Sequence, residues 1–167
     1  MGADLRIQRK PDLGAEPVAD ILIRSAKLNG ITIPLEQVPL AIDEFPALFI
    51  AAACAEGQTL LTGAEELRVK ESDRIAVMAE GLAALGVQSV ILPDGIRIEG
   101  RGNAAAVFNG GSVHSHDDHR IAMSFAMAGL RAAAPIKILD CANVNTSFPG
   151  FATLAARAGL AISEQTR

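Results

Sequence analysis

The feature that most constrains the fold of this chain is an order of helix and strand signals that occurs twice. Asp43, with Glu44 beside it, and Asp118 each precede a stretch with helical spacing of apolar residues, and Gly86 and Gly159 each follow a second such stretch. Acidic residues are favoured at helix starts and glycine just past helix ends, so these positions mark two helix pairs. The chain is therefore expected to be an α/β protein made of repeated units.

Four helices are expected from apolar residues that recur every three or four positions. The stripes begin at Phe45, Ile75, Ile121 and Phe151. Pro46 suits the first turn of the first helix, where its missing N–H costs no hydrogen bond.

Short apolar segments between these stripes predict strands. They are residues 59–62, 90–92, 96–98 and 136–139, with further segments near the N-terminus at 21–23 and 31–33. The Pro-Asp-Gly sequence at 93–95 predicts a hairpin, because glycine accepts the positive φ of a tight turn. Residues 4–17 are interpreted as a loop.

The repeats divide the chain into units at about 1–42, 43–117 and 118–167. The first unit has no helices before its strands, and the last has no closing hairpin. Repeated units need neighbours to cover their ends. We therefore expect residues 1–167 to form a single, incomplete domain of a larger protein.

Composition narrows the functional class. Half of the 167 residues are apolar, which is enough for one buried core, and no run of eighteen apolar residues predicts a membrane span. The N-terminus lacks the apolar segment of a signal peptide, and two cysteines suit a reducing cytoplasm. A net charge of −4 without Trp or Tyr argues against nucleic-acid binding.

A charged run lies at the expected start of the second helix, at residues 68–74, which read Arg-Val-Lys-Glu-Ser-Asp-Arg. Free backbone N–H groups at a helix start favour anions, and Lys70 and Arg74 add cations around Glu71. This pattern indicates a site for a phosphorylated or carboxylated ligand. A solvated, charged helix start is the simpler explanation of the same residues when they are taken alone.

A second cluster, residues 114–120, reads His-Ser-His-Asp-Asp-His-Arg. Its histidines suggest a metal site, but His116 and His119 are separated by a loop-to-helix junction and no cysteine joins them. In the alternative, which we favour, Asp118 caps the helix while His119 and Arg120 point from its first turn towards a ligand.

These motifs together resemble the C-terminal portion of the 5-enolpyruvylshikimate-3-phosphate synthases. Residues 67–75 are similar to the long signature of that family, and residues 118–123 to its second signature. Asp43 matches a third position, and residues 146–149 match the start of the family's final helix. The similarity runs from about Gly2 to Gly159.

The resemblance implies a reaction, the transfer of the enolpyruvyl group of phosphoenolpyruvate to the 5-hydroxyl of shikimate 3-phosphate with release of phosphate. It implies no metal and no organic cofactor. Carried over by motif, the candidate catalytic residues are the base Asp43, the proton donor Glu71 and the supporting His119. The candidate substrate-binding residues are Asp43 and Lys70 for shikimate 3-phosphate, with Arg74, Arg120 and Thr146 for phosphoenolpyruvate.

Two departures from the family pattern concern ligand contacts. Thr146 stands where many members have a lysine that reaches the phosphate of phosphoenolpyruvate. Glu66 stands where some members have an asparagine, and it is left out of the candidate site. Both positions put part of the carried-over ligand set in doubt.

The family fold implied by the resemblance has two domains, each built of three βαβαββ-type units around pseudo-threefold symmetry, with helices inside and sheets outside. Substrate binds between the domains, so the chain alone is expected to show no turnover. Two alternatives stay open. One is the related transferase that acts on UDP-N-acetylglucosamine, and the other is a noncatalytic binding module built from βαβ repeats.

Overall fold

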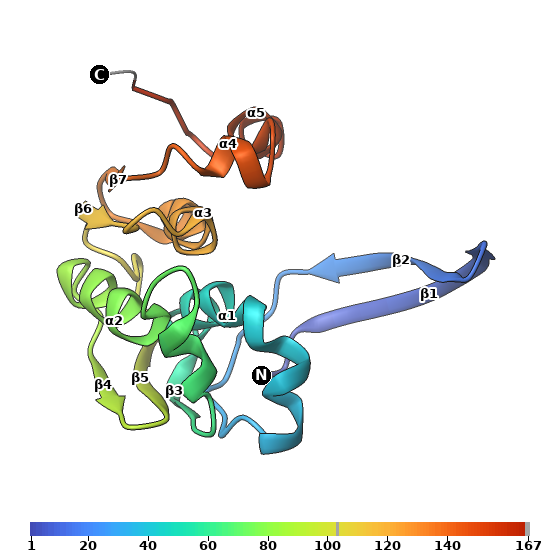
Figure 1. Cartoon of the computed structure of the whole chain (residues 1–167), viewed down its shortest axis with the longest axis horizontal. Coiled ribbons are helices and arrows are strands. Elements are labelled where there is room, and N and C mark those ends of the chain that lie inside the picture. The colour runs from blue at the N-terminus through green and yellow to red at the C-terminus, as the bar shows by residue number, and fades with distance from the viewer. Residues whose placement is uncertain (103, 166–167) are drawn as a thin grey trace.

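The computed structural model describes residues 1–102 and 104–165. Asn103 and residues 166–167, which fall in the predicted second and third units, lie outside the described residues. Helices and strands alternate along most of the chain, as the sequence predicted (Figure 1). None of the described helices combines the length and apolar character needed to cross a membrane.

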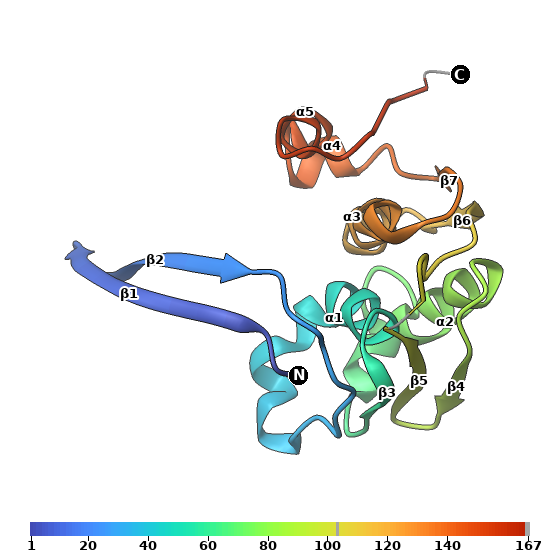
Figure 2. The ribbon, with the colours of Figure 1, turned by 180° about the vertical axis from the view of Figure 1, so that it is seen from behind.

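The N-terminal strands β1 (Asp4–Leu13) and β2 (Glu16–Arg24) form a long antiparallel hairpin, so the loop predicted over residues 4–17 is wrong. Two residues connect the strands, and Gly14 has the positive φ of 66° that such a turn requires. Leu5 and Ile7 alternate with charged residues along β1, which is the strand signal that the loop interpretation overlooked. Figures 1 and 2 show the hairpin extending away from the helices.

Three helices form the centre of the body, α1 (Phe45–Ala53), α2 (Arg74–Ala84) and α3 (His119–Ala128). Each contacts the other two. Phe45, Phe49, Met78 and Phe125 are among the side chains buried between them. All three begin within a residue or so of their predicted starts, because the apolar stripes match the faces that they bury.

Two sheets cover these helices from outside (Figure 1). The first has strand order β3 (Glu56–Leu61), β5 (Gly95–Arg101), β4 (Ser89–Leu92), all antiparallel, and β4 and β5 form the predicted hairpin. The second pairs β6 (Gly111–His114) in parallel with β7 (Ile136–Leu139). Residues 31–33 form only a single parallel bridge, Thr32 to Leu60, in place of the predicted strand.

The C-terminal segment adds the helices α4 (Val144–Ser147) and α5 (Phe151–Arg157). Ala155 and Leu160 pack on Ala126 in a small cluster beside the main core. The order α3, β7, α5 therefore repeats the order α1, β3, α2. The remaining elements are the 3-10 helices η1 (Leu35–Gln37), η2 (Pro39–Glu44), η3 (Glu65–Val69) and η4 (Gly129–Arg131).

Helix capping agrees with the sequence analysis at Asp118 and differs at Asp43. Asp73 accepts a hydrogen bond from the Ala76 N–H at the start of α2, and Asp118 caps α3 as predicted. Asp43 caps nothing, because η2 runs directly into α1. Its carboxylate is therefore available for contacts with other segments.

Candidate active site

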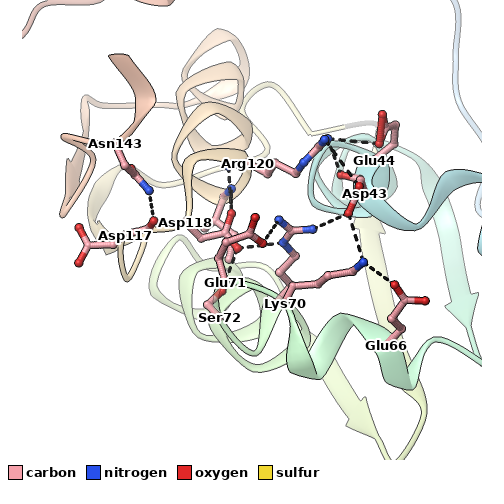
Figure 3. Close-up of polar contacts among 12 residues, drawn as sticks. Asp43, Glu44, Glu66, Lys70, Glu71, Ser72, Asp117, Asp118, Arg120 and Asn143 are labelled. Carbon is pink, nitrogen blue, oxygen red and sulfur yellow. Dashed lines mark hydrogen bonds and ion pairs between the residues drawn. The ribbon is translucent and has the colours of Figure 1, made fainter. Parts of the chain in front are cut away.

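The predicted signature residues meet where the starts of α2 and α3 face the end of η2. Figure 3 shows Asp43, Lys70, Glu71 and Arg120 pointing towards one another from these segments. Helix packing brings the three sequence motifs together, because each motif lies at the start of one of three helices that contact one another. The result is a cluster of cations and carboxylates at one end of the helix core.

Arg74 is the centre of this cluster. Its side chain is 1% exposed, and each guanidinium nitrogen faces a different carboxylate. Nε donates to Oδ2 of Asp118 at 2.8 Å, Nη1 to Oδ1 of Asp43 at 3.0 Å and Nη2 to Oε2 of Glu71 at 2.6 Å. Burial alone lowers the pKa of Arg74, but its hydrogen bond to Asp118 and the surrounding carboxylates raise the pKa above its ordinary value. Arg74 therefore stays charged and joins three segments of the chain.

Asp118 is fully buried, and its carboxylate accepts hydrogen bonds that compensate for that burial. Its Oδ1 accepts from the backbone N–H groups of Arg120 and Ile121 at the start of α3. Its Oδ2 accepts from Arg74 and, at 3.1 Å, from the Ser72 hydroxyl. One carboxylate thus caps α3 and fixes the signature segment before α2.

Asp43 faces three cations and remains 43% exposed. Besides Arg74, the Lys70 ammonium lies 3.7 Å from its Oδ1 and the Arg120 guanidinium 3.8 Å from its Oδ2. Burial raises the pKa of Asp43, but the hydrogen bond from Arg74 and the charges of Arg120 and Lys70 outweigh it, so the pKa lies below its ordinary value of 3.8. The carboxylate is ionised at neutral pH and accessible to a ligand.

Lys70 and Arg120 present cations at the rim of the cluster. Lys70 pairs with Glu66, and this hydrogen bond is the main reason that the pKa of Lys70 lies above its ordinary value. Arg120 donates to the backbone carbonyl of Asp43 at 3.0 Å and lies 3.4 Å from Oε2 of Glu44. Both side chains are partly exposed, so either can reach a bound anion.

The structure does not join every predicted site residue to this cluster. His119 is the first residue of α3 and partly exposed, but no hydrogen bond of its ring is found among the described residues. Thr146 lies on α4, exposed, and its side chain has no hydrogen bond to the cluster within residues 1–102 and 104–165. Asn143, the residue before α4, links this helix to the loop before α3, because its side-chain amide donates to the backbone carbonyl of Asp117.

The histidine-rich segment has no metal-binding geometry in the part of the chain that the structure describes, where no three His, Cys, Asp or Glu side chains surround a common point. His114 instead lies 3.1 Å from Asp140, and His116 lies 3.9 Å from Glu80. These are surface pairs, since every side chain involved is at least 44% exposed.

Sequence reasoning missed four contributors to the cluster, Ser72, Asp118 as a partner of Arg74, Glu44 and Glu66. Asp118 was predicted only as a helix cap, and Glu66 was left out. The only sequence signal for these contributors was that acidic and basic residues occur close together. Such a pattern does not indicate which carboxylate pairs with which cation. The pairs between Arg74 and both Asp43 and Asp118 depend on tertiary packing.

A buried guanidinium shared by carboxylates from three segments, with two further cations beside it, makes this end of the helix core a candidate site for a ligand that carries anionic groups. Comparison with known proteins identifies the family. The model of the family "EPSP synthase (3-phosphoshikimate 1-carboxyvinyltransferase)" matches residues 1–154. The chain belongs to the EPSP synthase family.

Individual relatives give the extent of the likeness. The chain is 65% identical to the 3-phosphoshikimate 1-carboxyvinyltransferase of Alkalilimnicola ehrlichii over 98% of its own length and 36% of that protein. It is 64% identical to that of Halorhodospira halophila, over 97% of its own length and 36% of that protein. The EPSP synthase structure from Acinetobacter baumannii superimposes with a TM-score of 0.95 at 59% identity, over 99% of this chain and 38% of that one. The chain thus spans little more than a third of these relatives.

Proposed function

We propose that the chain forms one wall of the active site of a 3-phosphoshikimate 1-carboxyvinyltransferase. The complete enzyme would transfer the enolpyruvyl group of phosphoenolpyruvate to the 5-hydroxyl of shikimate 3-phosphate and release phosphate, in the shikimate pathway of aromatic amino-acid biosynthesis. Membership of the EPSP synthase family supports this assignment, and the cluster around Arg74 is the observation in the structure that carries it.

The reaction needs a base and an acid that are held close together. The hydroxyl oxygen bonds to the central carbon of phosphoenolpyruvate as the hydroxyl proton leaves and a proton adds to the methylene carbon. Phosphate then departs as the resulting methyl group loses a proton, which restores the double bond. Asp43 and Glu71, both half exposed and both bonded to Arg74, are the proposed base and acid.

The cations have roles that follow from their exposure. Lys70 and Arg120 are partly exposed, so we assign to them contacts with shikimate 3-phosphate and with phosphoenolpyruvate respectively. Arg74 is buried, so its proposed contact with phosphoenolpyruvate requires Glu71 or Asp43 to give way. His119 and Thr146 keep the supporting and phosphate-binding roles that the family motif suggests.

The rest of the proposed site lies in the part of the relatives that this chain does not span. The cluster supplies two exposed cations, whereas the two substrates carry two phosphates and two carboxylates between them. We therefore propose that residues 1–167 belong to one domain of a two-domain enzyme, with the repeat units given above, and that the other domain supplies further cations. A cytoplasmic location belongs to the same proposal, because phosphorylated substrates do not cross membranes unaided.

A chimera tests the proposal. The third of the Alkalilimnicola ehrlichii enzyme that matches this chain is replaced by residues 1–167, and phosphate release is measured with phosphoenolpyruvate plus either shikimate 3-phosphate or UDP-N-acetylglucosamine. Turnover with shikimate 3-phosphate, abolished by Asp43→Asn or Glu71→Gln, is expected. A folded chimera that is inactive, or that uses only the nucleotide sugar, would contradict the proposal, as would full turnover by the 167-residue chain alone.

A further inference from the structure

Glu66 and Asp43 compete for the same cation. Glu66 lies on η3, four residues before Lys70, and its carboxylate forms an ion pair with the Lys70 ammonium. The ammonium also lies 3.7 Å from Oδ1 of Asp43, which is within ion-pair range but beyond a hydrogen bond. Figure 3 shows the Lys70 side chain running between the two carboxylates. Lys70 is therefore bonded to the carboxylate to which the proposed mechanism gives no role.

We propose that Glu66 is a positioning residue that holds the Lys70 ammonium away from Asp43, and so preserves the ability of Asp43 to accept a proton from a substrate hydroxyl. The effect of Glu66 on catalysis rests on the proposed function. The sharing of Lys70 between two carboxylates is independent of that function.

The charges around Asp43 explain why the position of one ammonium matters. Arg74 from α2 already donates to Oδ1 at 3.0 Å, and Arg120 from α3 lies 3.8 Å from Oδ2. Glu44, the other acidic residue on the segment of Asp43, faces Arg120 and leaves Lys70 to Glu66. A third cation in direct contact would stabilise the Asp43 carboxylate further, and a more stable carboxylate is a weaker base.

The backbone of η3 gives Glu66 this position. In a 3-10 helix residues three apart share a face, so the ion pair between residues 66 and 70 is formed at the end of η3, where the chain leaves the helix. Lys70 ends η3 in an extended conformation, with φ −80° and ψ −155°, and Leu67 of the same helix is buried in the core. The anchored helix thus fixes the acidic partner, while Asp43 approaches from the separate segment η2.

Nuclear magnetic resonance of the Asp43 carboxyl carbon in the 167-residue chain tests the structural part. Glu66→Gln is expected to lower the pKa of Asp43, both by removing a negative charge and by letting Lys70 move to Asp43. In a Lys70→Met background only the loss of the Glu66 charge remains, because there is no ammonium to move. The pKa of Asp43 is therefore expected to fall clearly less there than in the original background. Equal lowering in both backgrounds, or none in either, would overturn the proposal.

Glu65→Gln is the matched control. Glu65 is the neighbouring residue on η3, is exposed, and forms no ion pair within the described part of the chain. The substitution removes the same charge from the same helix but does not release Lys70, so the pKa of Asp43 is expected to fall much less than in Glu66→Gln. Glu66→Asp retains a carboxylate and is expected to restore part of the original behaviour.

Kinetics of the chimera test the consequence for catalysis. Glu66→Gln is expected to lower kcat roughly threefold to tenfold and to move the acid limb of the kcat profile to lower pH, with much smaller changes for Glu65→Gln. An inactive unsubstituted chimera would count against the proposed function, while the titration still decides the role of Glu66. If the chimera is active and Glu66→Gln changes neither its kcat nor the acid limb of its pH profile, the positioning role of Glu66 is overturned while the proposed function stands.

Discussion

Arg74 and Asp118 form an ion pair from which solvent is almost wholly excluded, with side-chain exposures of 1% and 0% and a distance of 2.8 Å from Nε to Oδ2. The pair joins the first residue of α2 to the cap of α3. Because a charge left without its partner in such a place is strongly destabilising, the two residues lock the relative positions of the two helix starts. Asp43 and Glu71, the residues of the proposed chemistry, are both bonded to Arg74 and are therefore held by this buried pair.

Two substitutions separate the two roles of Asp118. Asp118→Asn keeps an oxygen that can cap α3 but loses the charge that faces Arg74, and we expect it to cost roughly 2 kcal/mol. Asp118→Ala loses both and is expected to cost about 3–5 kcal/mol. Urea denaturation of the chain measures both. Asp20→Asn, which breaks an exposed pair with Lys10, is the control and is expected to change stability by less than about 1 kcal/mol. Equal costs for the two Asp118 variants would show that the charge facing Arg74, and not the cap of α3, is its contribution.

Removal of the Arg74 guanidinium tests the same pair from the other side. Arg74→Met leaves Asp118 buried without its cation and removes the cation that Asp43 and Glu71 share, so a loss of about 3–5 kcal/mol is expected. Arg74→Lys keeps one positive charge but cannot bond three carboxylates in three directions. Its stability is expected to lie between that of the original chain and that of Arg74→Met. Arg9→Met, at an exposed position on β1, controls for the change in net charge. A stable Arg74→Met variant would argue that the cluster contributes little to folding.

The lowered pKa of Asp43 predicts the pH dependence of stability. A carboxyl whose pKa is lower in the folded chain than in the unfolded one stabilises the fold above the unfolded value, near 3.8. That contribution disappears as the pH falls through the folded pKa. Asp43→Asn is therefore expected to be less stable than the original chain near neutral pH, with the difference vanishing once the pH lies below the folded pKa. Urea midpoints across this range measure it, and a difference that persists unchanged in acid would contradict the assignment.

Gly81 sets the contact between α2 and α3. A methyl group there would lie 2.2 Å from Cζ of Phe125, a fully buried ring. Glycine to alanine inside a helix normally gains about 1 kcal/mol, but overpacking costs typically 1–3, so we expect Gly81→Ala to be destabilising by roughly 1–2 kcal/mol. Gly129→Ala is the matched control, since its methyl would make an ordinary 3.6 Å contact with Leu160. It is expected to be neutral or slightly stabilising in the same denaturation experiment.

Much of the body could be predicted because its local signals and its packing agree. The apolar stripes of α1, α2 and α3 have the helical period and face the core, and Asp118 caps α3 as expected. Elements with weak signals were missed. Strand β6 offers one buried apolar residue, Val113, and its pairing with β7 depends on a segment more than twenty residues away.

Only part of the cluster's membership was predictable from the sequence, and its connections were not. The signature identified Glu71 and Arg74, and the resemblance added Asp43, yet no local pattern says that Arg74 bonds Asp43 across the helix core. The same limit explains Asp43 itself, which was expected to cap α1. Its carboxylate turns to cations on other segments because η2 already leads the backbone into the helix.

The hairpin of β1 and β2 has a practical consequence for handling the chain. Leu5, Ile7, Ile21 and Ile23 are between 49% and 68% exposed, and within the described residues neither outer edge of the hairpin pairs with another strand. Open edges of this kind recruit further strands from neighbouring molecules. We expect the isolated chain to self-associate increasingly as its concentration rises, so a dilution series by light scattering belongs before any of the measurements above.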